Sequence, residues 1–315
     1  MVLFSGKGGV GKTTLASAFA LSCALKGQKT LLIELNVKDR LNSLFGSVEV
    51  GSQIVEIEQN LWAVNITPQA AIEEYGLMRL KLKMVYKAVF ENRLVRSFLR
   101  AVPGLNDLVM LGKAHFHATE VDERGNYVWD KVVIDAPATG HGIFFLKIPS
   151  VITSIIDSGP MFSDAKKIED FIQDPELTAL NLVTLPEEMP VNETLELRQV
   201  VNNELKVPIG MIVANSVYPH VFSEEEMEWV EQTEDEQFDE EVSGFIDAAR
   251  FRTQRVNMQR EYVERLGEEV DEPFVKIPYY FTERFDFQTI RKIARELEEQ
   301  LDATPSSAKA RRSVG

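Results

Sequence analysis

The chain has 315 residues, of which 44% are hydrophobic and 26% are charged, and its formal net charge is −15. This length and composition are typical of a globular protein with one large α/β domain or two small ones. Because an acidic surface repels phosphate backbones, the charge disfavours a protein that binds nucleic acid without sequence preference.

A single cysteine, Cys23, excludes an intramolecular disulfide and a CxxC zinc site. This residue falls among small apolar residues, so we expect it to be packed in the core rather than reactive. No signal peptide precedes the first motif, and no apolar run approaches the ~20 residues that span a bilayer. We therefore expect a cytoplasmic protein without a transmembrane segment.

The first residues of the chain form its most informative motif. An apolar run at residues 2–4 predicts a strand, residues 6–13 fit the Walker A pattern GxxxxGK[ST], and a helix is expected up to residue 25. Glycines let backbone N–H groups fold around a phosphate, and the N-terminus of the helix adds partial positive charge. We expect Lys12 to reach the β- and γ-phosphates of ATP and the Thr13 hydroxyl to ligate Mg²⁺. The predicted nucleotide-binding residues of this loop are Gly8, Gly9, Val10, Gly11, Lys12, Thr13 and Thr14.

A second lysine, Lys7, follows the first glycine of the loop. The resulting sequence KGGVGKT resembles the deviant Walker A motif of the family that contains the ParA, MinD and ArsA ATPases. The resemblance implies a nucleotide-sandwich dimer in which Lys7 reaches across the interface to the nucleotide of the partner and acts in catalysis, together with Lys12. The alternative is that Lys7 is a solvated loop charge.

The next apolar run, at residues 30–34, predicts a buried parallel strand followed by a loop and a short helix at residues 36–46. In an open α/β sheet, ligands bind at the carboxyl ends of such strands. The family has an aspartate in this loop that positions the attacking water, whereas this chain has Asn36. An amide orients water but cannot accept its proton, and Asp39 is a candidate to take over that role. The resemblance thus adds Asn36 and Asp39 to the catalytic residues and implies slow hydrolysis.

A strand at residues 61–66 precedes a long helical pattern with one break, at Pro103-Gly104. A βαβ crossover needs only about a dozen residues, so residues 69–117 are interpreted as an inserted helical subdomain. Basic and apolar residues alternate in its middle, at Arg79, Lys81, Lys83, Lys87, Arg93, Arg96 and Arg100 and at Leu80, Met84, Val85, Val89, Leu94, Phe98 and Leu99. Such a helix binds a membrane surface, an acidic partner or an apolar client, or else is a packed helix with a solvated basic face.

A further strand is expected at residues 128–134, and it is followed directly by the octet DAPATGHG, which begins with Asp135. An aspartate at the end of an apolar strand is the form of a Walker B site, so Asp135 is predicted to hold Mg²⁺ together with Thr13. The octet resembles the switch II stretch of ArsA and of the eukaryotic ATPase that targets tail-anchored membrane proteins. This resemblance implies a loop that responds to the γ-phosphate; His141 is given no catalytic role.

The rest of the chain continues the alternation of strands and helices. Strands are expected at residues 180–186, 208–214 and 274–280, with helices at 187–205 and 287–301 and an acidic helix start at 223–241. We predict an α/β fold with a mainly parallel sheet flanked by helices, as in P-loop NTPases. Asn215 matches the family's adenine-contacting asparagine, although it would equally satisfy its own turn. Pro278 lies next to the nucleotide by family analogy.

These features predict a single ATPase domain at residues 1–301 and a disordered basic tail at 302–315. The resemblance implies an ArsA-like, Mg²⁺-ATP-dependent homodimer, or a heterodimer with a paralogue, that binds a protein client or a membrane-associated partner. The arsenite-binding cysteines of ArsA are absent, so metalloid pumping is not supported. The alternative function is a nucleotide-gated scaffold with little hydrolysis, which Asn36 would allow. A MinD-like membrane regulator or a ParA-like DNA partitioner fits the acidic charge least well.

Overall fold

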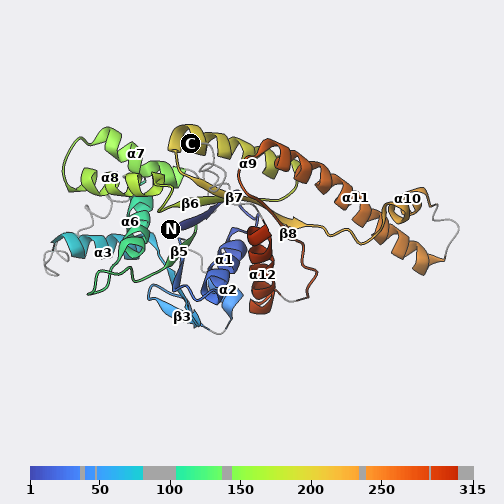
Figure 1. Ribbon diagram of the computed structural model, residues 1–315, viewed down its shortest axis with the longest axis horizontal. Coiled ribbons are helices and arrows are strands. Elements are labelled where there is room, and N and C mark those ends of the chain that lie inside the picture. The colour runs from blue at the N-terminus through green and yellow to red at the C-terminus, as the bar shows by residue number, and fades with distance from the viewer. Residues whose placement is uncertain are drawn as a thin grey trace.

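The computed structural model describes residues 1–35, 40–46, 48–80, 104–136, 144–233, 239–283 and 285–303. Within these residues lies an eight-stranded sheet with the order β3-β4-β2-β5-β1-β6-β7-β8 (Figure 1). Neighbouring strands are parallel except for β3 and β4. The strands are β1 (Val2–Ser5), β2 (Thr30–Glu34), β3 (Val55–Glu58), β4 (Leu61–Asn65), β5 (Lys131–Asp135), β6 (Ala179–Thr184), β7 (Ile209–Val217) and β8 (Phe274–Pro278).

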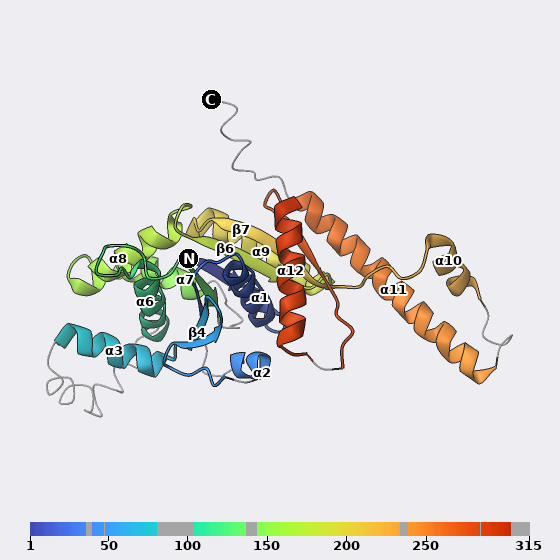
Figure 2. The same ribbon diagram turned by 60° about the horizontal axis from the view of Figure 1, so that its bottom comes forward.

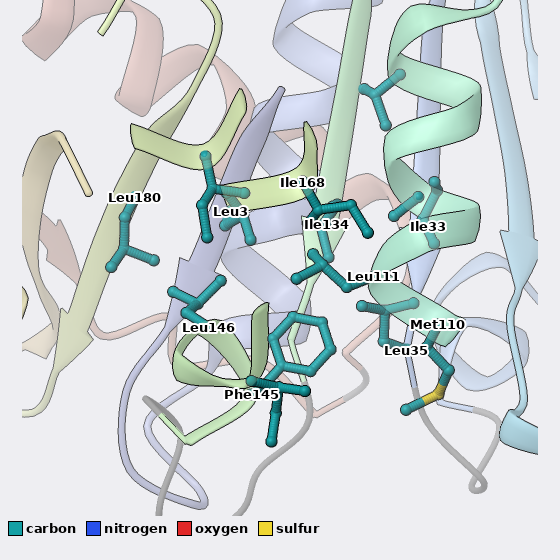
Figure 3. Close-up of a cluster of buried hydrophobic side chains, with 14 of the residues drawn as sticks. Leu3, Ile33, Leu35, Met110, Leu111, Ile134, Phe145, Leu146, Ile168 and Leu180 are labelled. Atoms are coloured by element: carbon teal, nitrogen blue, oxygen red, sulfur yellow. The ribbon is translucent and has the colours of Figure 1, made fainter. Parts of the chain in front are cut away.

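The central strands are mostly apolar because both faces of the sheet are covered by helices. Successive side chains point to opposite faces, so Leu3 and Phe4 of β1 lie in different hydrophobic clusters. Helices α1 (Lys12–Leu25), α2 (Leu41–Phe45) and α12 (Phe287–Ala303) cover the face of Phe4. The other face is covered by α6 (Leu105–Thr119), α7 (Phe144–Ile155), α8 (Pro160–Gln173) and the π-helical turn η1 (Val201–Leu205) that continues α9 (Glu188–Val200). Figure 3 shows this second cluster, including Met110 and Leu111 of α6 beside Ile33 and Ile134 of the sheet.

The predicted fold class is confirmed, with differences at several boundaries. Strand β5 begins at Lys131 rather than at residue 128, because the Val128 N–H donates to the Glu120 oxygen instead of a neighbouring strand. Strand β7 continues to Val217, and helix α12 continues to Ala303, past the expected start of the tail. Residues 304–315 lie outside the described part of the chain.

The helical segment between β4 and β5 begins with α3 (Pro68–Leu80) and ends with α6. The predicted break is confirmed at Gly104, whose left-handed backbone precedes the first residue of α6. Helix α6 packs on α3 and also directly on the sheet, so this half of the segment belongs to the central layers. Residues 81–103, which include most of the basic pattern and Met84, Val85, Phe98 and Leu99, lie outside the described residues. None of the described helices is long and apolar enough to cross a membrane.

Helices α10 (Glu224–Gln232) and α11 (Glu240–Glu269) form a hairpin that projects away from the sheet (Figures 1 and 2). We call this hairpin the α10–α11 arm. The predicted capping box is confirmed, since the Ser223 side chain accepts from the Glu226 N–H and the Glu226 carboxylate accepts from the Ser223 N–H. At 30 residues, α11 is about 45 Å long, from a rise of about 1.5 Å per residue.

Strand β8 lies at the end of the sheet, and a glutamine from α12 covers its outer side. The Gln300 Oε1 atom accepts from the backbone N–H of Lys276 at 2.9 Å, and its Nε2 atom donates to the Lys276 carbonyl at 2.6 Å. One side-chain amide therefore satisfies both backbone groups of the central residue of β8.

Candidate functional site

The loop between β1 and α1 is held in a conformation that requires glycine at two positions. Gly6 and Gly11 have φ angles of 147° and 93°. A Cβ atom would lie 2.2 Å from the Val183 carbonyl oxygen at Gly6 and 2.2 Å from the Asn215 Nδ2 atom at Gly11. Both contacts are far too short, so the neighbouring strands β6 and β7 press directly against the loop backbone. The loop is therefore shaped by the core of the sheet.

Lys12, the first residue of α1, turns back into this loop. Its Nζ atom donates to the Gly6 carbonyl at 3.0 Å and to the Lys7 carbonyl at 2.7 Å, and the side chain is buried. An ammonium group has three donors, so one remains for a further acceptor. Burial lowers the pKa of Lys12, and the charge of Arg40 lowers it further, whereas Asp135 raises it. An anion beside Lys12 would offset the cost of burying the lysine charge, and it would accept the remaining N–H bond.

Thr13 and Asp135 meet at the ends of neighbouring elements, as the sequence predicts. The Thr13 hydroxyl donates to the Asp135 Oδ2 atom at 2.6 Å, and both residues are buried. The Oδ1 atom of Asp135 has no hydrogen-bond partner among the described residues. Burial raises the pKa of Asp135 to about 6, against the opposing effects of the Thr13 bond, Lys12 and Arg40. A buried carboxylate with one unpaired oxygen, next to a hydroxyl, is suited to a hard divalent cation such as Mg²⁺.

Other kinds of metal site find no support in the described part of the chain. It contains no group of three His, Cys, Asp or Glu side chains that could hold a metal ion. The single cysteine, Cys23, is free and buried, as expected, and burial raises the pKa of its thiol. Oxygen ligands at Thr13 and Asp135 therefore remain the candidate for metal binding.

Asn215 lies inside β7, and its side chain holds the P-loop. The Nδ2 atom donates to the Val10 carbonyl at 2.9 Å, across 205 residues of sequence. The side chain thus fixes the loop, so the alternative in which it satisfies only its own turn is wrong. Its contact with adenine stays a prediction. Pro278 ends β8 and pairs in register with Val217, two residues beyond Asn215, which places it on the neighbouring strand.

Lys7 does not point into the loop. Its Nζ atom lies 2.6 Å from the Glu193 Oε1 atom of α9, and the two side chains are 40% and 42% exposed. An exposed ion pair of this kind contributes at most about 1 kcal/mol, so the lysine can exchange this partner for another anion at little cost. The pairing with Glu193 joins residues 186 positions apart, and no local motif in the sequence predicts it.

A buried glutamate, also absent from the predicted site, lies beside Asp135. Glu34 ends β2, is completely buried and pairs in register with Asp135 of β5. It accepts from the Arg40 backbone N–H at 3.0 Å and from the Asn65 Nδ2 atom at 3.4 Å. The first bond ties Arg40 to the end of β2, and the second joins the ends of β2 and β4. The sequence signal that could have identified Glu34 is a charged residue at the end of an apolar strand. Asn36 and Asp39 themselves, and residues 137–143 with His141, lie outside the described residues.

The site combines a glycine loop, a buried lysine and a Thr–Asp pair at the carboxyl ends of parallel strands, which is the arrangement of a P-loop nucleotide site. The family model of anion-transporting ATPases (ArsA ATPases) matches residues 1–162 and 157–299. The chain belongs to this family. The resemblance drawn from the Walker A and switch II motifs is thereby confirmed.

This ArsA-family chain matches some relatives over almost their full length and others over only a part. The ATPase BagA of Mycobacterium tuberculosis is 31% identical over 224 residues, which are 69% of this chain and 65% of the relative. The arsenical pump-driving ATPase of Escherichia coli is 28% identical over 197 residues, 58% of this chain and 33% of the relative. ATPase GET3 of Lachancea thermotolerans is 21% identical over 337 residues, 96% of this chain and 90% of the relative. The chain thus matches slightly less than two thirds of the mycobacterial relative.

Proposed function

We propose that this ArsA-family chain binds Mg²⁺-ATP between Lys12, Thr13 and Asp135 and hydrolyses it slowly as a dimer. The observation that carries this proposal is the buried Thr13–Asp135 pair, in which one carboxylate oxygen has no partner among the described residues. Beside it lies the buried Lys12 ammonium group, two of whose three donors are used within the described part of the chain. Bound Mg²⁺ would neutralise charge on the phosphates. Lys12 would hold the β- and γ-phosphates, and Asn215 would keep the loop in shape.

The alternative proposal, a nucleotide-gated scaffold with little turnover, differs only in the hydrolysis step. Asn36 can orient a water molecule but cannot accept its proton. Asn36→Asp is expected to raise the single-turnover rate by about 10²-fold, the lower end of the usual range of general-base effects. Quenched-flow measurement with excess enzyme tests this. The scaffold function is favoured if the wild-type chain binds ATP but forms no ADP from the bound ATP. The Mg²⁺-ATP site itself is wrong if neither protein binds ATP.

A client or partner is the second part of the proposed function, and its support is a cavity between α3, α6 and α8. The cavity has a volume of about 500 Å³. Its walls include Leu108, Val109, Met161 and Ile168, and Phe116 at its edge is 45% exposed. Apolar cavities of this size are common binding sites. We propose that the helices between β4 and β5 bind a protein client or a membrane-associated partner, and that no nucleic acid is bound.

The proposed dimer makes a specific prediction for Lys7. Lys7→Ala is expected to leave ATP affinity within about threefold of wild type, because the exposed Lys7–Glu193 pair contributes little. Turnover is expected to fall by about 10²-fold or more, because a cation that reaches the transferring phosphate is lost. Lys26→Ala is the matched control, since Lys26 is also an exposed, ion-paired lysine but lies at the other end of α1. Its turnover is expected to be unchanged.

Mixed subunits test whether Lys7 acts in the partner. A subunit with Lys7→Ala retains its own metal site, and one with Asp135→Asn retains Lys7. If Lys7 acts in trans, mixtures of the two variants regain activity in proportion to the fraction of mixed dimers. Activity that stays at the average of the two parents at every mixing ratio contradicts action across an interface.

A further inference from the structure

The projecting end of the α10–α11 arm is rich in acidic residues. Between residues 221 and 249 the sequence contains twelve Asp and Glu residues and no Lys, Arg or His, whereas the whole chain has 49 acidic and 34 basic residues. On α10, the acidic residues are Glu224, Glu225, Glu226, Glu228 and Glu231. The end of the arm therefore has an excess of negative charge. The first basic residue of α11, Arg250, pairs with Asp247 and donates to the Thr233 carbonyl at the end of α10.

The same end of the arm exposes large apolar side chains that its own packing does not use. Helices α10 and α11 meet through buried Met227, Val230 and Ile246. In contrast, Trp229 of α10 is 57% exposed and Phe245 of α11 is 72% exposed. Exposed aromatic residues, particularly tryptophan, are the residues that most often dominate the free energy of protein–protein binding.

The body of the protein does not cover these side chains. Figures 1 and 2 show, from two directions, that α10 and the first half of α11 extend beyond the sheet and beyond α12. The contacts of α11 with the body begin near its middle, where Arg252 donates to the Pro219 carbonyl and lies over the Phe281 ring. They continue in its second half, where buried Leu266 packs beside β7 and α9. A projecting hairpin whose end combines exposed aromatic groups with an excess of carboxylates has the chemistry of a docking surface.

We propose that the α10–α11 arm docks a basic amphipathic helix of a partner protein. The apolar face of such a helix would cover Trp229 and Phe245, and its lysines and arginines would pair with the surrounding carboxylates. Nucleic acid and anionic membranes are repelled by the same charge. Two arms meeting in a symmetric pair would place like charges together, which disfavours a second copy of this chain as the occupant.

The first test uses Trp229 as the reporter of binding. Trp62 and Trp129 pack against each other at the other end of the sheet, and Trp129 is buried. The probe is a helical peptide of about 18 residues with lysines on one face, leucines on the other and no tryptophan. Titration into the full chain is expected to shift the emission of Trp229 to shorter wavelength, and the affinity is expected to fall about tenfold or more between about 50 and 300 mM NaCl. A peptide with glutamate in place of lysine is expected to give no shift.

Variants then locate the binding to the arm. Phe245→Ser is expected to weaken peptide binding about tenfold or more, in the range of interface hot spots. The triple variant Glu224→Gln, Glu225→Gln, Glu228→Gln is expected to do the same. The matched control neutralises three exposed glutamates nearer the base of α11, Glu261, Glu264 and Glu268, and is expected to change the affinity less than twofold.

Three results would overturn the proposal. They are the absence of binding by the lysine peptide, equal losses in the two triple variants, and unchanged binding by Phe245→Ser. A fourth measurement addresses the other occupant: if Phe245→Ser alone changes the sedimentation coefficient of the chain without peptide, the arm is a contact between copies. Because all substituted residues are exposed, the unfolding midpoints are expected to match wild type.

Discussion

Lys12→Ala is expected to reduce ATP turnover by at least about 10²–10³-fold, the usual effect of removing one preorganised group that stabilises the transition state. Lys12 is the one P-loop side chain whose charge lies inside the loop, where its ammonium group is held by the Gly6 and Lys7 carbonyls. Low local polarity makes this charge more effective than a surface lysine. Steady-state release of phosphate and titration with a fluorescent ATP analogue would measure both turnover and binding.

Controls separate this effect from damage to the loop. Because the alanine leaves two backbone carbonyls without their donor, a modest loss of stability is expected as well. Lys12→Met retains most of the side-chain volume without the charge and should lose turnover equally. If either variant keeps wild-type turnover and ATP affinity, the nucleotide site is not where we place it.

Asp135→Asn is expected to abolish Mg²⁺-dependent ATP binding and, in the absence of metal and nucleotide, to stabilise the fold at neutral pH. The pKa of Asp135 is raised from 3.8 to about 6, which means that burial penalises its charge. A shift of this size corresponds to about 3 kcal/mol, which is the upper limit of the gain in the free energy of unfolding at pH 7. Urea unfolding in EDTA would measure it.

The stability difference between wild type and Asp135→Asn is expected to depend on pH. Between pH 4 and pH 6 the folded state holds the Asp135 proton more tightly than the unfolded state does, so the contribution of this group to stability falls as the pH rises. Wild type and Asp135→Asn should therefore be equally stable near pH 4 and differ most above pH 6. Unchanged affinity for Mg²⁺-ATP in Asp135→Asn would contradict the metal site.

The sequence predicts those parts of the site that lie in one short motif or directly at the end of a strand. The loop, Lys12, Thr13 and Asp135 follow from motif spacing, because a P-loop needs glycines, a lysine and a hydroxyl in one short segment. The Lys7–Glu193 pair and the support of the P-loop by Asn215 join segments about 200 residues apart, and no local pattern specifies which carboxylate or amide arrives there. The burial of Glu34 likewise depends on β4 and β5 lying on either side of it.

The elements that the sequence does not predict have weak or misleading local signals. Helix α7 contains Pro149, which a sequence pattern treats as a break. Helix α11 is mostly polar, and only a narrow buried stripe that includes Ile246 and Val256 reveals it. Strand β3 is short, partly exposed and antiparallel at the edge of a sheet whose other strands are parallel. In each case contacts with other elements, rather than local propensity, decide the structure.

The amide of Gln300 has a consequence for how this protein can assemble. A free strand at the end of a sheet is a template on which another chain can add a strand, either as a specific partner or in uncontrolled aggregation. The Gln300 side chain bonds both backbone groups of Lys276, as a neighbouring strand would do. The middle of β8 is therefore not free to pair with another strand. Association through growth of the sheet is thereby blocked at β8. Contacts with another molecule at this end of the sheet are therefore left to helices and loops.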